Sequence, residues 1–216
     1  MRCCLCQLPQ AKKFYEGAGS FIGYNYSMPI VDDHFIDQET SESIKNFIFS
    51  NTSGMPWFFN ENTNVEDPQR IYCIGTDNTR SSFQMVSPVE PSHPLYNTIV
   101  SLLNVFAAKH GFSYNSISRI KINLIPRDPD FTMEYHHMPH IDSDGEHQVF
   151  IYYVNDSDGD TILFDDFFNG QTPKLESFER ISPKQGRGMV FNGLQYHASS
   201  SPCYSKYRCI INVDFE

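Results

Sequence analysis

The part of the chain after Gly111 is a series of short β-rich segments separated by polar turns, and this pattern restricts the fold more than any other feature. In residues 117–125, the apolar Ile120 and Ile122 alternate with the polar Lys121 and Asn123, as expected for a strand with one buried face. Four further β-rich segments follow, at residues 148–154, 161–164, 188–191 and 208–215. Several short strands divided by turn residues predict an antiparallel β-sandwich or barrel.

Two helices are expected before this β-rich half. The first is expected within residues 32–50, which carry one apolar face and end at a cluster of turn residues. The second is expected to have Ser92 as its N-cap and Gly111 as its C-cap, around an apolar stripe at helical spacing. Shorter strands are expected at residues 28–31 and 83–86, and the aromatic residues 55–59 are expected to form a strand or an anchor against the core. The predicted fold class is therefore α+β, mainly β.

The composition favours one folded domain. The chain has 216 residues, of which 40% are hydrophobic, so a substantial core can form. We expect a tail over residues 1–26 and a single domain over residues 27–216. The formal net charge is −10 and the Lys and Arg residues are scattered, which disfavours binding to nucleic acid. No apolar segment approaches the roughly 18 residues of a membrane span, so a soluble protein of the cytoplasm without membrane contact is predicted.

The six cysteines do not form a regular framework. Cys3, Cys4 and Cys6 crowd the start of the chain, and the other three are dispersed. This spacing argues against a disulfide scaffold and favours a reducing compartment. A zinc site at the first three would need a fourth nearby ligand, which the following residues lack. The role of this cluster is left open.

His140 and Asp142 are the strongest candidates for a metal site. Residues two apart in a strand point to the same side, so an imidazole and a carboxylate at this spacing can converge on one point. His197 would complete the two-His, one-carboxylate arrangement that holds non-haem Fe(II). Arg208, on the last predicted strand, can direct its guanidinium at a carboxylate held near the metal. Because the chain has eight histidines, ordinary polar roles for these residues are the alternative.

Several motifs occur in one order along the second half of the chain. They are His140-Ile-Asp142, Ile151-Tyr-Tyr-Val-Asn155, Asp158-Gly-Asp-Thr161, Gly186-Arg-Gly-Met-Val-Phe191, His197 and Arg208. In this order they resemble the 2-oxoglutarate- and Fe(II)-dependent dioxygenases, in particular the prolyl-hydroxylase-like branch and its phage-encoded relatives. The resemblance covers about residues 117–215, and the upstream helix and Pro56-Trp57 resemble the supporting elements of the same group.

The resemblance implies a double-stranded β-helix, a jelly-roll core over about residues 117–216, with helical support over about residues 32–111. By this resemblance, His140, Asp142 and His197 match the iron ligands. Arg208 matches the basic residue that pairs with the distal carboxylate of 2-oxoglutarate. Tyr153 matches a tyrosine whose hydroxyl shares that carboxylate, and a core aromatic position is the alternative interpretation.

Asn123 and Tyr135 are further candidates for contact with the cofactor. Some relatives place an Asn or Tyr near the cofactor on the strand before the iron-binding His, and these two residues are the options here. His136 and His137 lie close enough to His140 for a shifted ligand assignment. Neither has a carboxylate two residues further on, so both are predicted to be loop or substrate-side residues.

The resemblance also implies an activity. The protein would use Fe(II), 2-oxoglutarate and O₂, with ascorbate as a candidate reductant, to hydroxylate a C–H bond and release succinate and CO₂. A prolyl residue in a peptide or protein is the leading candidate substrate, and a free amino acid, another small molecule or a modified nucleobase are alternatives. A phage-encoded enzyme would act in the host cytoplasm. The rival function class is a non-catalytic jelly-roll binding module.

Residues 156–160, Asp-Ser-Asp-Gly-Asp, have the composition of a calcium-binding loop. However, the glycine is misplaced, and Phe167 occupies the twelfth position, where such a loop needs Glu. Asp and Gly supply the positive-φ conformations of tight turns. A β-hairpin turn is therefore predicted at these residues.

Overall fold

The computed structural model describes residues 28–64 and 71–216, so the predicted tail and its cysteine cluster lie outside the described residues. The described part forms two antiparallel sheets and two helices. The strands are β1 (Ile30–Asp32), β2 (Phe58–Asn60), β3 (Gln84–Pro88), β4 (Ile117–Pro126), β5 (Gln148–Tyr153), β6 (Thr161–Phe167), β7 (Phe178–Ile181), β8 (Gly188–Asn192), β9 (Gln195–Ser199) and β10 (Tyr207–Phe215), and the helices are α1 (Gln38–Ile48) and α2 (Tyr96–His110). The predicted mainly β class is confirmed. Among the described residues, neither helix has the length and apolar character needed to span a membrane.

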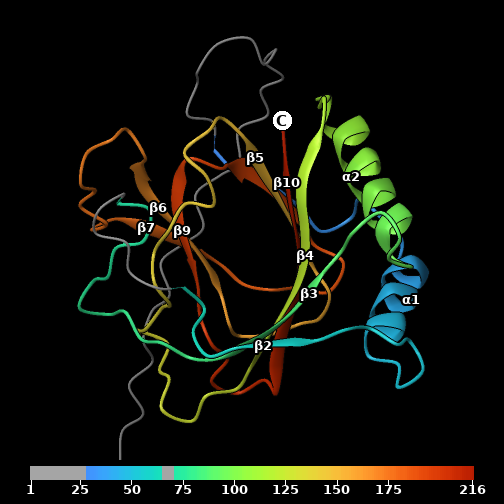
Figure 1. Cartoon of the computed structure of the whole chain (residues 1–216), viewed down its shortest axis with the longest axis horizontal. Coiled ribbons are helices and arrows are strands. Elements are labelled where there is room, and N and C mark those ends of the chain that lie inside the picture. Colours follow the sequence, from blue (N-terminus) through green and yellow to red (C-terminus); the bar gives the residue numbers. More distant parts are fainter. Residues whose placement is uncertain (1–27, 65–70) are drawn as a thin grey trace, which may run out of the picture.

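The two sheets differ in size and lie face to face. The large sheet has the strand order β1-β8-β5-β10-β4-β3-β2, and the small sheet has the order β7-β6-β9. Figure 1 shows the helices and the small sheet on opposite sides of β4, β5 and β10. The large sheet therefore has a helix-covered face and an inner face that looks toward the small sheet.

Strand alternation explains this division. On β10, Cys209, Ile211 and Val213 belong to the core that the helices cover, together with Phe106 of α2. The intervening Ile210 belongs to the core between the sheets, which also contains alternate residues of β5 and β8. Because successive side chains of a strand point to opposite faces, each central strand contributes to both cores.

The helix ends test the predicted caps. Gly111 ends α2 with a φ of 74° and donates its N–H to the carbonyl of Ala107, as predicted. Ser92 is not the N-cap, because the chain makes a turn first: the N–H of His93 bonds to Glu90 and that of Tyr96 bonds to His93. The helix consequently begins at Tyr96, and its N-cap position, Leu95, has no side-chain capping bond.

Residues 156–160 do not form the predicted hairpin turn. They connect β5 of the large sheet with β6 of the small sheet, and these strands do not pair with each other. Gly159 does not have a positive φ. A side chain is excluded there by crowding instead, since a Cβ atom would lie 2.7 Å from the carbonyl oxygen of Ser200. Asp158 accepts three backbone N–H groups from residues 203–205, which holds this loop beside the start of β10.

Gly188 on β8 provides a test of the packing beneath the helices. A Cβ atom at this position would lie 2.7 Å from a ring carbon of Phe106 and 2.8 Å from one of Phe35. Gly188→Ala is therefore expected to lower the free energy of unfolding by about 1–3 kcal/mol through overpacking, as measured by urea denaturation. Gly145→Ala is the matched control, because its Cβ would meet only Ser143 at 3.6 Å. Equal stability of the two variants would contradict the close packing at Gly188.

Candidate metal centre

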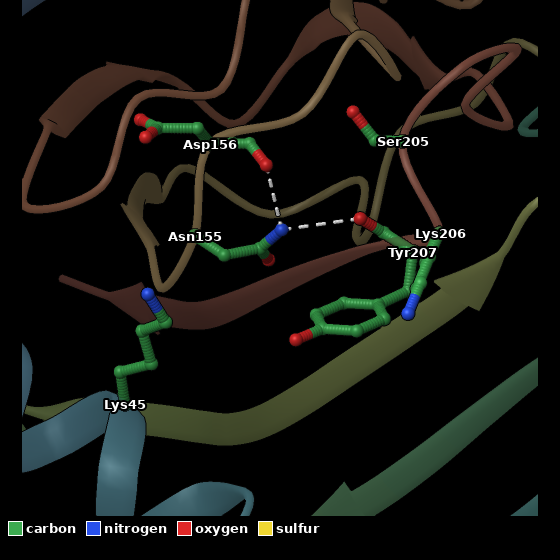
Figure 2. Close-up of a pocket in the computed structure, with 6 residues that line it drawn as sticks. All are labelled: Lys45, Asn155, Asp156, Ser205, Lys206 and Tyr207. Carbon is green, nitrogen blue, oxygen red and sulfur yellow. Dashed lines mark hydrogen bonds between the residues drawn. The ribbon is translucent and has the colours of Figure 1, made fainter.

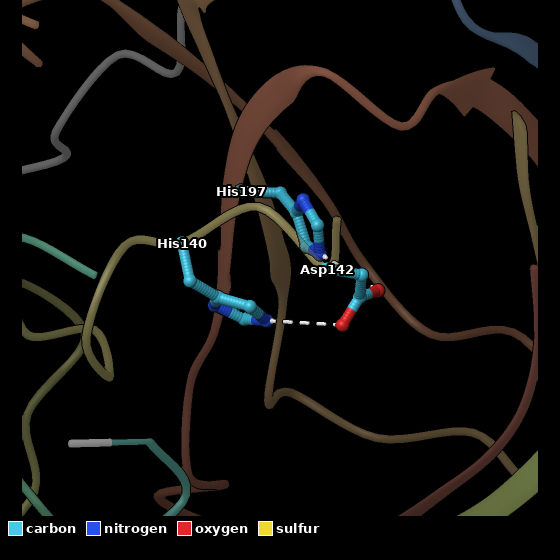
Figure 3. Close-up of side chains that lie close together, drawn as sticks. All are labelled: His140, Asp142 and His197. Carbon is cyan, nitrogen blue, oxygen red and sulfur yellow. Dashed lines mark ion pairs between the residues drawn. The ribbon is translucent and has the colours of Figure 1, made fainter. Parts of the chain in front are cut away.

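The structure brings His140, Asp142 and His197 together at one point (Figure 3). One ligand atom from each residue lies within 4.8 Å of the other two. His140 Nε2 is 3.9 Å from Asp142 Oδ1, and His197 Nε2 is 3.7 Å from Asp142 Oδ2. Two imidazole nitrogens and a carboxylate thus face a common centre, which is the donor set that first-row divalent metals accept.

Backbone pairing positions the two histidines. The N–H of each donates to the carbonyl of the other at 2.9 Å, so His140 forms an isolated antiparallel bridge with His197 of β9. The prediction of a strand through Asp142 is wrong, because Asp142 lies in a bend beyond the bridge. The alternation still holds locally: Ile141 is buried in the core on the outer side of the small sheet, whereas its two neighbours face the centre (Figure 3).

The hydrogen bonds of the imidazoles leave their Nε2 atoms to serve as ligands. Nδ1 of His197 lies 3.0 Å from the carbonyl oxygen of Gln195. Nδ1 of His140 lies 3.0 Å from the carbonyl oxygen of Met138. An Nδ1–H that donates to a carbonyl fixes the tautomer with a lone pair on Nε2.

The electrostatics of the centre also suit a cation. Burial, together with the neighbouring His197, lowers the pKa of His140 to about 3, so its imidazole is neutral at pH 7. Burial alone would raise the pKa of Asp142, but Lys121 and His197 outweigh it and hold the pKa well below its usual value. Oδ2 of this ionised carboxylate is buried and has no hydrogen-bond partner within the described residues. A buried anionic oxygen of this kind is stabilised by a bound cation.

Two cationic side chains of β4 reach the same carboxylate. Arg119 Nη2 lies 2.7 Å from Asp142 Oδ1 and 2.6 Å from Asp214 Oδ2, and Lys121 Nζ lies 3.7 Å from Asp142 Oδ1. Neither Arg119 nor Asp214 was predicted from the sequence to be a site residue. The signal that could have identified them is the alternation of polar residues with apolar ones on both strands, at 119, 121 and 123 and at 208, 212 and 214.

Arg208 forms a second polar centre with Tyr153 and Thr161. Arg208 is 1% exposed, and its Nη2 donates to Thr161 Oγ1 at 2.7 Å. The Tyr153 hydroxyl donates to the same oxygen at 2.8 Å. Burial lowers the pKa of Arg208, and Arg208 Nε has no hydrogen-bond partner among the residues described. A buried guanidinium with an unused donor is suited to binding a carboxylate.

Asn155 holds the backbone on both sides of Arg208. Its amide nitrogen donates to the carbonyls of Asp156 and Tyr207, and its amide oxygen accepts the N–H of Cys209 at 2.9 Å. Figure 2 shows the first two of these bonds in a surface pocket of about 270 Å³. The pocket is lined by Lys45, Asn155, Asp156, Ser205, Lys206 and Tyr207. None of these residues belongs to the triad, and we assign the Asn155 contacts a role in fixing the start of β10.

The other predicted site residues occupy different surroundings. Asn123 lies on the inner side of β4, where it donates to Gln84, and its buried Oδ1 has no partner in the described part of the chain. The ring of Tyr135 lies 4.1 Å from the guanidinium of Arg80. His136 and His137 lie in the segment between β4 and β5, as predicted for loop residues, and both are buried. They bond to Thr76 and to Ser82, Ser199 and Ser201.

Neither a protein-family model nor a curated protein matches the sequence. An oxidoreductase of the 2OG-Fe(II) oxygenase family from Burkholderia pseudomallei is similar in structure, with a TM-score of 0.58 and 14% identity, over 87% of this chain and 84% of that chain. HygX from Streptomyces hygroscopicus, with nickel and 2-oxoglutarate bound, has a TM-score of 0.56 and 10% identity, over 87% and 82% of the two chains.

A prolyl hydroxylase from Trichoplax adhaerens is also similar. It forms a complex with a peptide fragment of the hypoxia inducible factor oxygen degradation domain, and it matches with a TM-score of 0.53 and 15% identity over 87% of this chain and 82% of that chain. At these identities, structural similarity shows the fold alone. The chain therefore has a fold that is shared by 2OG-Fe(II) oxygenases, prolyl hydroxylases among them.

Proposed function

We propose that the protein is a non-haem Fe(II), 2-oxoglutarate-dependent dioxygenase built on a double-stranded β-helix. The observation that carries the proposal is the convergence of His140, Asp142 and His197, with the buried Oδ2 of Asp142 lacking a partner among the described residues. In this proposal the three residues hold Fe(II). The structural neighbours, which include a 2-oxoglutarate complex, support the same cofactor pair.

Each residue of the proposed site has a task set by its chemistry. With 2-oxoglutarate and O₂, bound Fe(II) would supply the oxidising power for hydroxylation of a C–H bond, with release of succinate and CO₂. Three protein ligands on one face leave other coordination positions open. Arg208 would bind the distal carboxylate of 2-oxoglutarate through charge-assisted hydrogen bonds. Thr161 accepts bonds from both Arg208 and Tyr153, so its own O–H is left to donate to that carboxylate.

The wall of the site would exclude water from this chemistry. The core between the sheets contains Val149, Ile151 and Tyr153 on one face of β5, opposite Leu163 of the small sheet. Such apolar surroundings strengthen the Arg208–carboxylate interaction. We also propose that one of the two candidates, Asn123 or Tyr135, contacts the cofactor. The unpartnered Oδ1 of Asn123 supports the first assignment, whereas the contact of Tyr135 with Arg80 directs its ring toward a different group.

A prolyl residue in a peptide or protein is the proposed substrate. The support for it is the sequence resemblance and the peptide complex of the Trichoplax adhaerens neighbour. A free amino acid, a small molecule and a modified nucleobase are the alternatives that the assay must separate.

Anaerobic titration with Fe(II) and 2-oxoglutarate tests the proposed function. The expected result is a weak visible charge-transfer band that requires both components. A succinate-release screen of prolyl peptides, amino acids and modified nucleosides, with and without ascorbate, then identifies the substrate class. A protein that binds neither component would instead be a non-catalytic jelly-roll module.

Asn155→Ala tests whether the contacts beside Arg208 matter for 2-oxoglutarate binding. Removing the side chain leaves the N–H of Cys209 without its partner, so we expect a loss of about 1–3 kcal/mol in stability. The KM for 2-oxoglutarate should rise, because Arg208 is less well fixed, while the affinity for metal is retained. Asn104→Ala, at an exposed position on α2, serves as the control. An unchanged KM for Asn155→Ala would show that Arg208 keeps its position without the hydrogen bonds of the Asn155 side chain.

A further inference from the structure

Arg119 is placed beside the proposed metal ligand by strand register. β4 and β10 pair antiparallel, with Arg119 directly opposite Asp214. Both side chains project from the inner face, where Nη2 of Arg119 lies between Asp214 Oδ2 and Asp142 Oδ1 at 2.6 and 2.7 Å. The Asp142 and Asp214 side chains are 6% and 8% exposed. A row of two buried carboxylates with one guanidinium between them thus ends at the proposed metal ligand.

The two oxygens of Asp142 have different surroundings. Oδ1 forms ion pairs with Arg119 Nη2 at 2.7 Å and Lys121 Nζ at 3.7 Å, whereas Oδ2 has neither an Arg or Lys contact nor a hydrogen-bond partner in the part of the chain that is described. Because a carboxylate rotates as a rigid plane, holding one oxygen fixes the direction of the other. The oxygen left over is the one that lies 3.7 Å from His197 Nε2.

We propose that Arg119, anchored by Asp214, positions the Asp142 carboxylate so that Oδ2 alone is presented to the metal. This inference rests on the metal site of the proposed function and adds two residues that support that site from outside the ligand set. Partners of metal ligands orient them and commonly affect metal affinity about 10- to 100-fold.

The negative charge of Asp214 explains its part in the proposed positioning of Asp142. A cation beside a metal site opposes metal binding by repulsion. Asp214 provides a compensating negative charge at 2.6 Å, so the Arg119–Asp214 pair is neutral as a unit. The pair can hold Asp142 without reducing the net negative charge that the metal meets.

Lys121 lies near the same carboxylate as Arg119 but interacts with it differently. Its ammonium lies 3.7 Å from the same Oδ1, which is too far for a hydrogen bond. Lys121 therefore acts on Asp142 through its charge, and Arg119 acts through contact as well. Removal of Lys121 should leave metal affinity unchanged or higher, whereas removal of the Arg119 contact should lower it.

The test compares Co(II) binding by the full chain and by charge-matched variants. Arg119→Met/Asp214→Asn removes one positive and one negative charge, so its net charge equals that of the parent. We expect its dissociation constant for Co(II) to rise about 10- to 100-fold and its d–d absorption bands to shift, because Asp142 can rotate. Lys121→Met should show no loss of affinity.

Arg187→Met/Asp33→Asn is the matched control. It removes the ion pairs of Asp33 with Arg187 and Lys184, and none of these residues belongs to the triad. Its Co(II) affinity and spectrum should equal those of the parent. Urea denaturation without metal establishes that each variant is folded.

The outcomes separate this inference from the proposed function. Parent-like affinity and bands for Arg119→Met/Asp214→Asn would overturn the positioning role while leaving the metal site intact. An equal loss of affinity in Lys121→Met would also overturn it, because contact would then add nothing to charge. Failure of the parent protein to bind Co(II) would overturn the metal site and, with it, this inference.

Discussion

Replacement of His140 by Ala is expected to abolish succinate release from 2-oxoglutarate. The substitution removes one of the two imidazole ligands, and no histidine of the described chain besides His140 and His197 lies in the triad. Metal ligation contributes several kcal/mol to such chemistry, so the rate should fall by about 10³-fold or more. Metal affinity, measured anaerobically with Fe(II), should fall in parallel. His197→Ala should behave in the same way, because both Nε2 atoms face Asp142.

His34→Ala is the control for this prediction, because His34 is exposed and lies outside the triad. It should retain the turnover and metal affinity of the parent. Urea denaturation distinguishes a missing ligand from a missing fold. Turnover retained by folded His140→Ala would show that the triad does not hold the metal.

Replacement of Arg208 by Met is expected to raise the KM for 2-oxoglutarate about 10- to 100-fold, since a hydrogen bond to a charged group contributes about 1.5–3 kcal/mol. Met keeps much of the apolar volume of the Arg stem, which matters at a side chain that is 1% exposed. The affinity for Fe(II) alone should not change, because Arg208 is not among the ligands. Steady-state succinate release across 2-oxoglutarate concentrations gives the KM.

Arg127→Met is the control, since Arg127 is exposed and follows β4 near the same end of the sheet. Its KM should equal that of the parent. Arg208→Lys keeps the charge without the planar donor pair, so it should lie between the parent and Arg208→Met. If Arg208→Met had the parental KM, another residue would have to hold the distal carboxylate.

The longer strands with apolar or alternating residues were predicted, whereas the short strands β7 and β9 were missed. β4 and β10 place apolar residues at every second position against the helices, and this local pattern is visible in the sequence. β7 and β9 are short, and β9 contains the polar residues Gln195, His197 and Ser199. Their strand conformation depends on pairing with β6. A single sequence carries little local signal for such strands.

Some residues of the site were predicted from the sequence, and others were identified only from contacts between distant parts of the chain. His140, Asp142, His197 and Arg208 were selected from motif order and ligand chemistry, and the first three lie together in the structure. Thr161, Arg119 and Asp214 were not selected as site residues, because their partners are distant in the chain. Arg119 meets Asp214 through strand register, and Thr161 meets Arg208 where the two sheets face each other.

By itself, the sequence determined the mainly β class, the end of α2 at Gly111 and the candidate ligands, because each depends on residue type and local spacing. The tertiary structure alone decided that His140 pairs with His197, that one oxygen of Asp142 is held by Arg119, and that Arg208 is buried beside Thr161. These contacts require the register between strands and the approach of two sheets. Both arise from the packing of the whole chain, which no single segment specifies.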